Sequence, residues 1–174
     1  MRQQRIAVAV SGMAIAGVFG ATAYAANPEP VVVEVEFVAP ITITETNPIQ
    51  FGLVDVNMGS GETIVISPGG GVTDAASNLL NGAQAPAELT ITATDGEAIN
   101  IMVDNVSNGT GYALSAFQCE YNGAAAAVCD GAGLNTNAAA GGTATLTIGA
   151  TLTGNGSATV GPDNGSFEVT VAYQ

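Results

Sequence analysis

The sequence predicts an all-β domain, an antiparallel β-sandwich of immunoglobulin-like type. Two observations predict it. Apolar residues alternate with threonine and other polar residues over several short runs, which is the period of a half-buried strand. Turn signals rich in glycine, asparagine and proline separate these runs, and no long helical pattern is present to cover a sheet face. A closed β-barrel is the alternative architecture that the same pattern allows.

The first 25 residues have the features of a secretory signal peptide. Arg2 and Arg5 precede an apolar run over residues 6–19, and Ala23-Tyr24-Ala25 supplies a cleavage site of the small-x-small kind. The apolar run is shorter than the roughly 20 residues that a bilayer span needs. We therefore predict a signal peptide over residues 1–25 and an exported protein without a membrane span, which reaches the cell surface or the extracellular space through the periplasm.

Residues 26–39 form an N-terminal arm with two different faces. One face carries Val31, Val33, Val35 and Phe37, whereas the other is partly acidic. Burying four such side chains is worth roughly 6–12 kcal/mol, so we do not expect the arm to stand in solvent. It is predicted either to fold back in cis as the first strand of a complete domain, or to enter a groove in a neighbouring subunit by β-strand addition.

The remaining residues, 40–174, form the predicted sandwich domain, and six of their runs alternate clearly. The alternating apolar positions are Ile41 and Ile43; Ile64 and Ile66; Leu89, Ile91 and Ala93; Ile99, Ile101 and Val103; Ala144, Leu146, Ile148, Ala150 and Leu152; and Phe167, Val169, Val171 and Tyr173. The spacing of the turn signals predicts about eight or nine strands in all. Only residues 74–83 are candidates for a helical turn.

The two cysteines, Cys119 and Cys129, bracket a stretch rich in glycine and alanine. Export places them in an oxidising compartment, where a disulfide that closes this loop would contribute roughly 2–3 kcal/mol. A redox or metal-binding pair is the alternative, but it lacks the CxxC spacing and a nearby cation that would activate a thiol. We predict a structural disulfide.

The charge of the chain excludes most classes of function. Fifteen acidic residues stand against two basic ones, both in the leader, and histidine is absent, so the formal net charge is −13. Once the leader is removed, no cationic side chain remains to bind nucleic-acid phosphates electrostatically, and no side chain can form a Schiff base or act as an imidazole base. We predict that the protein does not bind nucleic acid and is not an enzyme.

Paired carboxylates are the remaining groups that could catalyse a reaction. A glycosidase needs two of them, which makes Asp95 with Glu97 and Glu34 with Glu36 the pairs to consider. The first pair flanks a turn glycine, the second lies on the solvated face of the arm, and the chain has no tryptophan to stack on a sugar. We predict no catalytic residue.

Calcium is the one cofactor that this composition could suit. Asp104, Asp130, Asp163 and Asn164 are predicted to lie in loops, and carboxylates with loop carbonyls are the ligands that calcium prefers. The sequence has no D-x-[DN]-x-[DN]-G run, however. We therefore predict no cofactor and no metal site, with calcium as the alternative.

The C-terminus has a glycine, Gly161, ahead of an alternating run of Phe167, Val169, Val171 and the penultimate Tyr173. This pattern resembles the C-terminal motif of chaperone–usher pilins, in which a glycine precedes a last strand with alternating apolar positions. The resemblance implies a strand that a periplasmic chaperone pairs with, an usher as a further partner, and an arm that enters a neighbouring subunit lacking one strand. The cysteines differ from the usual pilin disulfide, which joins the first strand to the second.

A second resemblance covers nearly the whole mature chain. Three stretches are similar to a bacterial family of exported β-proteins catalogued as domain of unknown function 4402: PITITETNPIQFGLVDV, AELTITATDGEAINIMV, and the end of the chain from GGTATLTIGATLTG to GSFEVTVAYQ. This resemblance implies an exported sandwich at the cell surface and no established activity.

The alternating apolar residues of the arm and of the C-terminal strand together predict a structural role for the protein. The leading hypothesis is a pilin-like subunit of an extracellular filament (fimbrium) or surface layer, which polymerises by donor-strand exchange of the arm and serves in cell adhesion. The alternative is a monomeric exported surface or matrix domain that binds glycan, calcium or another protein.

Overall fold

The computed structural model describes residues 32–174. One compact unit spans Phe37–Gln174. A separate unit precedes it, and the structure describes only Val32–Glu36 of that unit. The predicted signal peptide, residues 1–25, and Val31 of the arm lie outside the described residues.

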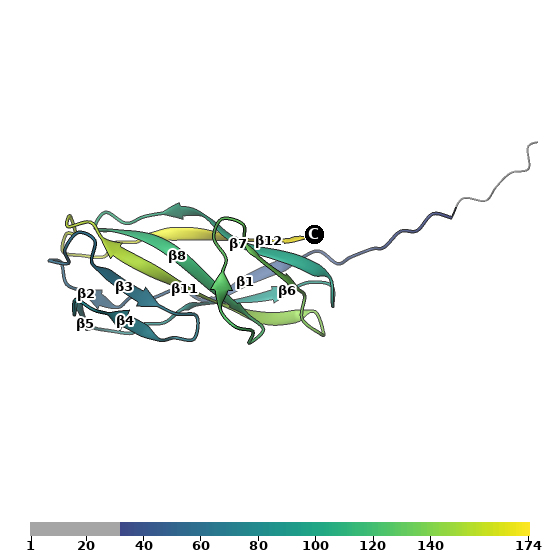
Figure 1. The fold of residues 1–174 in the computed structure, drawn as a ribbon, viewed down its shortest axis with the longest axis horizontal. Helices are drawn as coiled ribbons and strands as arrows, with labels where there is room; N and C mark the ends of the chain where they lie inside the picture. Colours follow the sequence, from purple (N-terminus) through teal and green to yellow (C-terminus); the bar gives the residue numbers. More distant parts are fainter. Residues whose placement is uncertain (1–31) are drawn as a thin grey trace, which may run out of the picture. The chain divides into compact units, whose positions relative to one another are not determined.

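The described residues form twelve strands and no helix (Figure 1). The strands are β1 (Thr42–Asn47), β2 (Leu53–Val54), β3 (Thr63–Ile66), β4 (Val72–Asp74), β5 (Leu79–Asn81), β6 (Ala87–Thr92), β7 (Ala98–Ser107), β8 (Tyr112–Tyr121), β9 (Ala127–Val128), β10 (Leu134–Asn137), β11 (Thr143–Gly154) and β12 (Ser166–Tyr173). All their pairings are antiparallel, which confirms the predicted class. The expectation of a helical turn over residues 74–83 is wrong, because β4 ends and β5 lies there. Across the described part of the chain, no helix is long and apolar enough to cross a membrane.

The larger sheet is built around β11. Strand β6 pairs with its first half, β3 with its second half, and β8 runs along its other edge. Beyond these neighbours lie β1 on β6, β4 on β3, and β9 on β8. The change of neighbour occurs at Gly149, where an added Cβ would collide with the carbonyl oxygen of Ile66. Glycine is therefore required at this point of close backbone approach.

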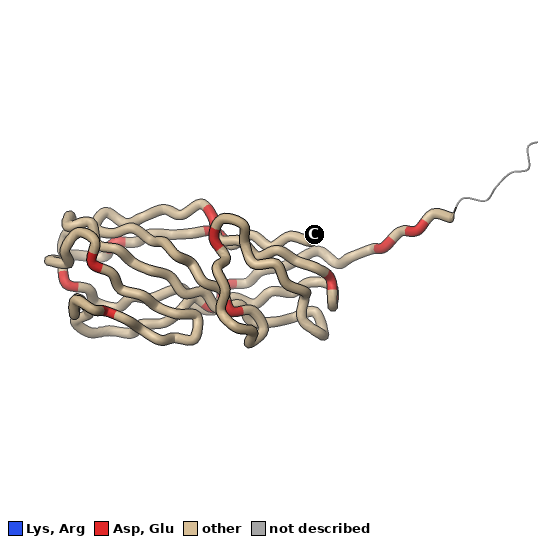
Figure 2. The backbone as a smooth tube through the Cα atoms, viewed as in Figure 1, with Lys and Arg blue, Asp and Glu red and all other residues tan. Residues whose placement is uncertain are grey.

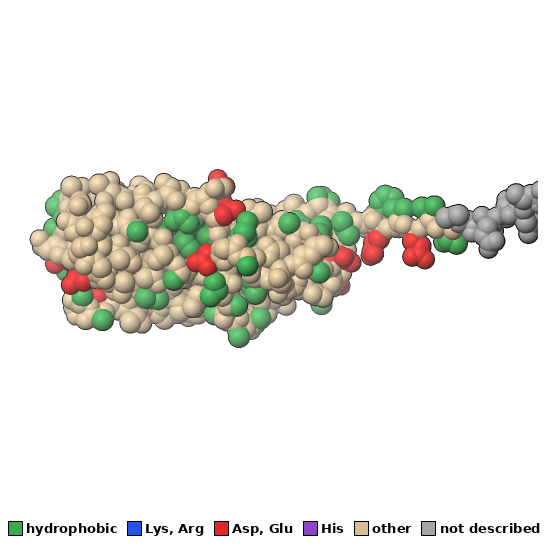
Figure 3. Space-filling model, turned by 45° about the horizontal axis from the view of Figure 1, so that its top comes forward, with side chains coloured by type: hydrophobic (Ala, Val, Ile, Leu, Met, Phe, Trp, Pro, Cys, Tyr) green, Lys and Arg blue, Asp and Glu red, His purple; other side chains and the backbone are tan. Residues whose placement is uncertain are grey.

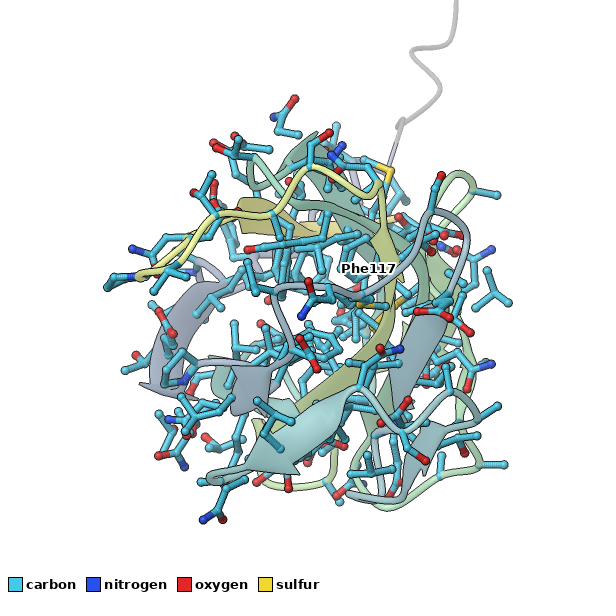
Figure 4. All side chains as sticks on the ribbon, turned by 90° about the vertical axis from the view of Figure 1, so that its left-hand side faces the viewer. Phe117 is labelled. Atoms are coloured by element: carbon cyan, nitrogen blue, oxygen red, sulfur yellow. A yellow bond between two sulfur atoms is a disulfide. The ribbon has the colours of Figure 1, made fainter. Side chains whose placement is uncertain are left out.

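The smaller sheet has the order β10-β7-β12, and the core lies between it and the larger sheet. Strand β7 buries Ile99, Ile101 and Val103 against residues of β6, β8 and β11, because alternate side chains of a strand point to one face. Phe117 of β8 is buried in the interior, where its ring lies 5.0 Å from that of Phe167 of β12 (Figure 4). The aromatic pair thus joins the two sheets across the core.

Main-chain hydrogen bonds link the two sheets along one side of the domain. The amide of Val103 in β7 donates to the carbonyl of Cys129, and the amide of Cys129 donates to the carbonyl of Phe117 in β8. Cys129 also forms the predicted disulfide with Cys119, and both cysteines are fully buried. This side is therefore closed by a covalently anchored segment.

The opposite side of the domain is open. Within the described residues β1 pairs only with β6, and β12 pairs only with β7, so each leaves one edge without a partner strand. The two sheets therefore do not close into a ring, and the alternative of a closed barrel is wrong.

Candidate functional site

A groove of about 430 Å³ lies between the open edges of β1 and β12. Ile43 and Glu45 of β1 form one wall, and Phe167 and Val169 of β12 form the other. The lining is completed by Pro48, Ile49, Ala87, Leu89, Leu114, Gly165 and Ser166. Apart from Glu45, the side chains that line the groove carry no charge, so the groove suits an apolar occupant.

Strand β12 presents the predicted C-terminal motif to this side of the core. Phe167, Val169, Val171 and Tyr173 are half-buried and pack against the core, and the four residues that alternate with them are exposed. Their partial burial follows from the unpaired edge, because no neighbouring strand covers them on that side. Gly161 lies outside β12, in the preceding loop, with a positive φ of 132°.

Strand β1 is unusually exposed for a strand that flanks a core. All six of its residues are exposed, and Ile43 retains 36% of its surface. A strand at the edge of a packed sheet normally buries alternate side chains. The exposure of β1 and the half-burial of β12 together indicate that the core is incomplete between them.

Tyr173 does not line the groove, but it joins the end of β12 to the residues before β1. Its hydroxyl donates a hydrogen bond to the carbonyl of Ala39, just before β1, and accepts one from the amide of Thr94, just after β6; both are 2.7 Å long. The Ala39 amide in turn donates to the Thr94 hydroxyl. The sequence motif indicated Tyr173 as a residue of the strand face, but not that its hydroxyl ties the two sheets together.

At one end the groove opens into a larger cleft of about 1050 Å³, called here the end cleft. The two hollows share Ile49, Leu114 and Gly165 in their linings. The end cleft lies between the β2–β5 pair and the loop of residues 155–165. Its lining includes three strongly exposed apolar side chains, Leu53, Leu80 and Val160. This cleft could not be predicted from the sequence, because these residues follow no strand periodicity.

A polar network holds the loop of residues 155–165 in place. The carboxylate of Asp163 accepts hydrogen bonds from the amides of Thr110 and Gly111, and the Tyr112 hydroxyl donates to the Asp163 carbonyl. The amide of Gly165 donates to the same hydroxyl. Burial of the ring raises the pKa of Tyr112, and the negative charge of Asp163 raises it further.

The described part of the arm is exposed and makes no strand. Val33 retains 80% of its surface, Val35 65% and Phe37 91%. Its hydrophobic side chains gather mainly on one side and its acidic side chains lie on the other (Figure 3). The described residues of the arm therefore form no strand.

The acidic residues considered for chemistry are dispersed (Figure 2). Asp104 lies within β7 opposite Glu168 rather than in a loop, which corrects the prediction. Asp130 accepts a hydrogen bond from the amide of Phe117, whereas Asp163 binds the amides already described. In residues 32–174 no three or more acidic or cysteine side chains gather where they could hold a metal ion. The set proposed for calcium, with Asn164 as its fourth member, is accordingly not assembled.

The fold and the groove together define a class of protein: an all-β domain of two packed sheets, in which the edge strands β1 and β12 face each other without a strand between them. The sequence profile of the family described as domain of unknown function (DUF4402) matches residues 41–173, and the chain belongs to this family. The match begins just before β1 and ends with β12, so it includes both edges of the groove, whereas the arm precedes it. No curated protein and no solved structure matches the chain.

Proposed function

We propose that the protein is a structural subunit of an extracellular filament or surface layer, and that it polymerises by donor-strand exchange. The domain is an immunoglobulin-like sandwich that lacks one strand, and the arm of residues 31–37 from a neighbouring subunit supplies it. One observation carries the proposal: the unpaired edges of β1 and β12 face each other across an apolar groove.

The backbone of the two edges supports this function. A strand placed between β1 and β12 would pair with the free N–H and C=O groups of both, which is the chemistry of β-strand addition. Edges left open in this way attract other strands. An exported subunit therefore needs a partner for them, first a periplasmic chaperone and usher and then the next subunit.

The side chains of the arm also suit the groove. With alternate residues facing inward, Val33, Val35 and Phe37 would cover the half-buried Phe167 and Val169, while Glu34 and Glu36 would stay in water. Each large apolar side chain that becomes fully buried contributes about 1.5–3 kcal/mol. The free-energy cost of bringing two subunits together opposes this total burial free energy. The arm, exposed in the single chain, thus gains its burial in the polymer.

Deleting the arm tests the proposal. The mature chain should form polymers visible by sedimentation and negative-stain microscopy, whereas a chain that lacks residues 26–38 should stay soluble and folded. The shortened domain should bind a peptide of residues 27–38. The matched control is the same peptide with Val33→Asn and Val35→Asn, which keeps its charge and should not bind.

Two results would contradict donor-strand exchange. A mature chain that stays monomeric and folded without a chaperone would favour the alternative, a monomeric surface or matrix domain that binds glycan, calcium or protein. A polymer that persists after deletion of the arm would show that assembly uses another surface.

A further inference from the structure

We propose that Asn122, in the turn between β8 and β9, is a site of spontaneous covalent modification, where the side-chain amide is lost and aspartate or isoaspartate forms. Water is the co-reactant. The inference is independent of the proposed function, because it rests on this turn and not on the groove or the arm. The modification adds a negative charge, and the isoaspartyl product also adds a carbon atom to the main chain.

The reaction joins an asparagine side chain to the main-chain amide of the next residue. The amide nitrogen of Gly123 attacks Cγ of Asn122, the Cγ–Nδ2 bond breaks, and Nδ2 leaves as ammonia with the proton of the attacking amide. Water then opens the cyclic imide at one or the other of its C–N bonds, which gives aspartate or isoaspartate. A following glycine favours the attack, because it has no Cβ to hinder the approach.

Five asparagines of the chain precede a glycine: Asn81, Asn108, Asn122, Asn155 and Asn164. All five are exposed, so exposure does not distinguish them. They differ in whether hydrogen bonds hold the two reacting groups, which are the side-chain amide and the glycine nitrogen. A hydrogen bond that holds either group has to break before the attack, and it therefore slows the reaction.

In two of the five pairs the side-chain amide is held. The Oδ1 of Asn108 accepts a hydrogen bond of 2.8 Å from the amide of Leu114. Asn155 is held at both ends of its side-chain amide, because its Oδ1 accepts from the amide of Ser157 and its Nδ2 donates to the carbonyl of Thr110. These two asparagines are protected by the loops in which they lie.

In two further pairs the glycine nitrogen is held. The amide of Gly165, which would attack Asn164, donates a hydrogen bond of 2.7 Å to the Tyr112 hydroxyl. The amide of Gly82 donates to the Oδ1 of Asn81 itself. A donor to a carbonyl oxygen lies near the plane of that carbonyl group, whereas the attack on Cγ comes over the face of the plane. Both pairs are therefore protected as well.

Asn122 and Gly123 are the remaining pair. Within the described residues, neither the side-chain amide of Asn122 nor the main-chain amide of Gly123 forms a hydrogen bond. Both residues have a positive φ, 52° and 71°, and the amide of Ala124 donates to the carbonyl of Tyr121, as in a type I′ turn. Both reacting groups of this pair are thus free.

The modified turn leads into the segment that joins the two sheets. Isoaspartate lengthens the main chain of a two-residue turn by one carbon, which the type I′ geometry does not accommodate, so the hydrogen bond from Ala124 to Tyr121 is lost. Two residues later than β9 begins, Cys129 is fixed by its disulfide to Cys119 and donates to β8. The modification therefore changes the turn and leaves the junction of the sheets in place.

Tandem mass spectrometry of the purified full chain, incubated folded at neutral pH, measures how fast each pair is converted. The chain is digested after aromatic residues and leucine, since it has no basic residue beyond Arg5 for trypsin. Asn122 should be converted first, roughly fivefold or more faster than each of the other four, which is the factor that one hydrogen bond is worth. Asn122→Gln should abolish this first conversion, and Asn81→Gln, the matched control, should leave it unchanged.

The same chain incubated in denaturant provides the reference, because all five pairs then lose their hydrogen bonds and their rates should converge. First conversion at another pair of the folded chain, or equal rates at all five, would overturn the proposal. So would an Asn122 that stays intact in the folded chain under conditions in which the denatured chain is converted.

Amide hydrogen exchange of the converted chain tests the structural consequence. Exchange at Ala124 should become faster, whereas exchange at Val103, whose amide donates to the carbonyl of Cys129, should stay unchanged. Unchanged exchange at Ala124, or faster exchange at Val103, would overturn the predicted effect on the turn.

Discussion

The hydroxyl of Tyr173 lies 2.7 Å from the carbonyl oxygen of Ala39, which brings the last residue of β12 against the residues that precede β1. This contact joins two sheets whose edges otherwise stay apart along the groove. It also fixes the point from which the chain leaves the domain toward its arm.

Replacing Tyr173 by phenylalanine should weaken this junction. The substitution removes two short hydrogen bonds and leaves the amide of Thr94 without its partner, so we expect the domain to lose about 1–2 kcal/mol of unfolding free energy. Urea denaturation of the chain that lacks residues 26–38 measures the loss without interference from assembly. An unchanged midpoint would show that the junction contributes nothing to stability.

Removing the disulfide should cost about 2–3 kcal/mol, because it closes a short loop in the unfolded chain. Cys119→Ala with Cys129→Ala suits this test, since both side chains are fully buried and serine would bury unpaired hydroxyls. Denaturation with and without reductant provides the control: the reductant should lower the stability of the native chain only. Equal stability of variant and native chain would show that the segment around Cys129 is held by its hydrogen bonds alone.

Self-association should weaken at low ionic strength. If residues 1–25 are removed, as the sequence predicts, no basic side chain remains to offset the fifteen acidic ones, and subunits then repel each other unless salt screens them. The screening length is about 30 Å at 0.01 M salt and about 4 Å at 0.5 M. Sedimentation at these two concentrations measures the effect, and Glu34→Gln with Glu36→Gln should reduce it. Equal association at both concentrations would refute the electrostatic argument.

Alkaline pH should destabilise the loop beside the end cleft. Burial raises the pKa of Tyr112, so the folded state favours its neutral form; the resulting stability is present below about pH 10 and is lost as pH rises through the raised pKa. Phenolate absorbance and unfolding, followed together in the native chain and in Tyr112→Phe, check this. The variant should lack the alkaline step. A step of the same size in both chains would assign it to another group.

The strands that keep a strict alternation were predictable. Residues 143–153 alternate without interruption and form most of β11, the longest strand. Strand β8 escaped prediction because a bulge at Ala116, with φ 51°, shifts its inward positions by one residue between Leu114 and Phe117. Over residues 74–83, tertiary pairing of β3 with β4 and of β2 with β5 outweighed a weak helical tendency.

The position of the groove between β1 and β12 could not be predicted from the sequence. The sequence indicated the C-terminal strand and the arm, each from a local period of two. That β12 lies opposite β1 follows from pairings between residues far apart in the chain, such as Tyr173 with Ile99 and Ile43 with Ile91. For the arm, alternation alone predicts burial in cis and in trans equally well.

Amide hydrogen exchange of the arm-less domain, with and without the peptide of residues 27–38, tests donor-strand exchange most directly. The account predicts that the peptide slows exchange at the unpaired amides of β1 and β12 together, while the segment around Cys129 on the opposite side stays unchanged. Unaltered exchange at both edges in the presence of bound peptide, or protection confined to another part of the domain, would contradict it.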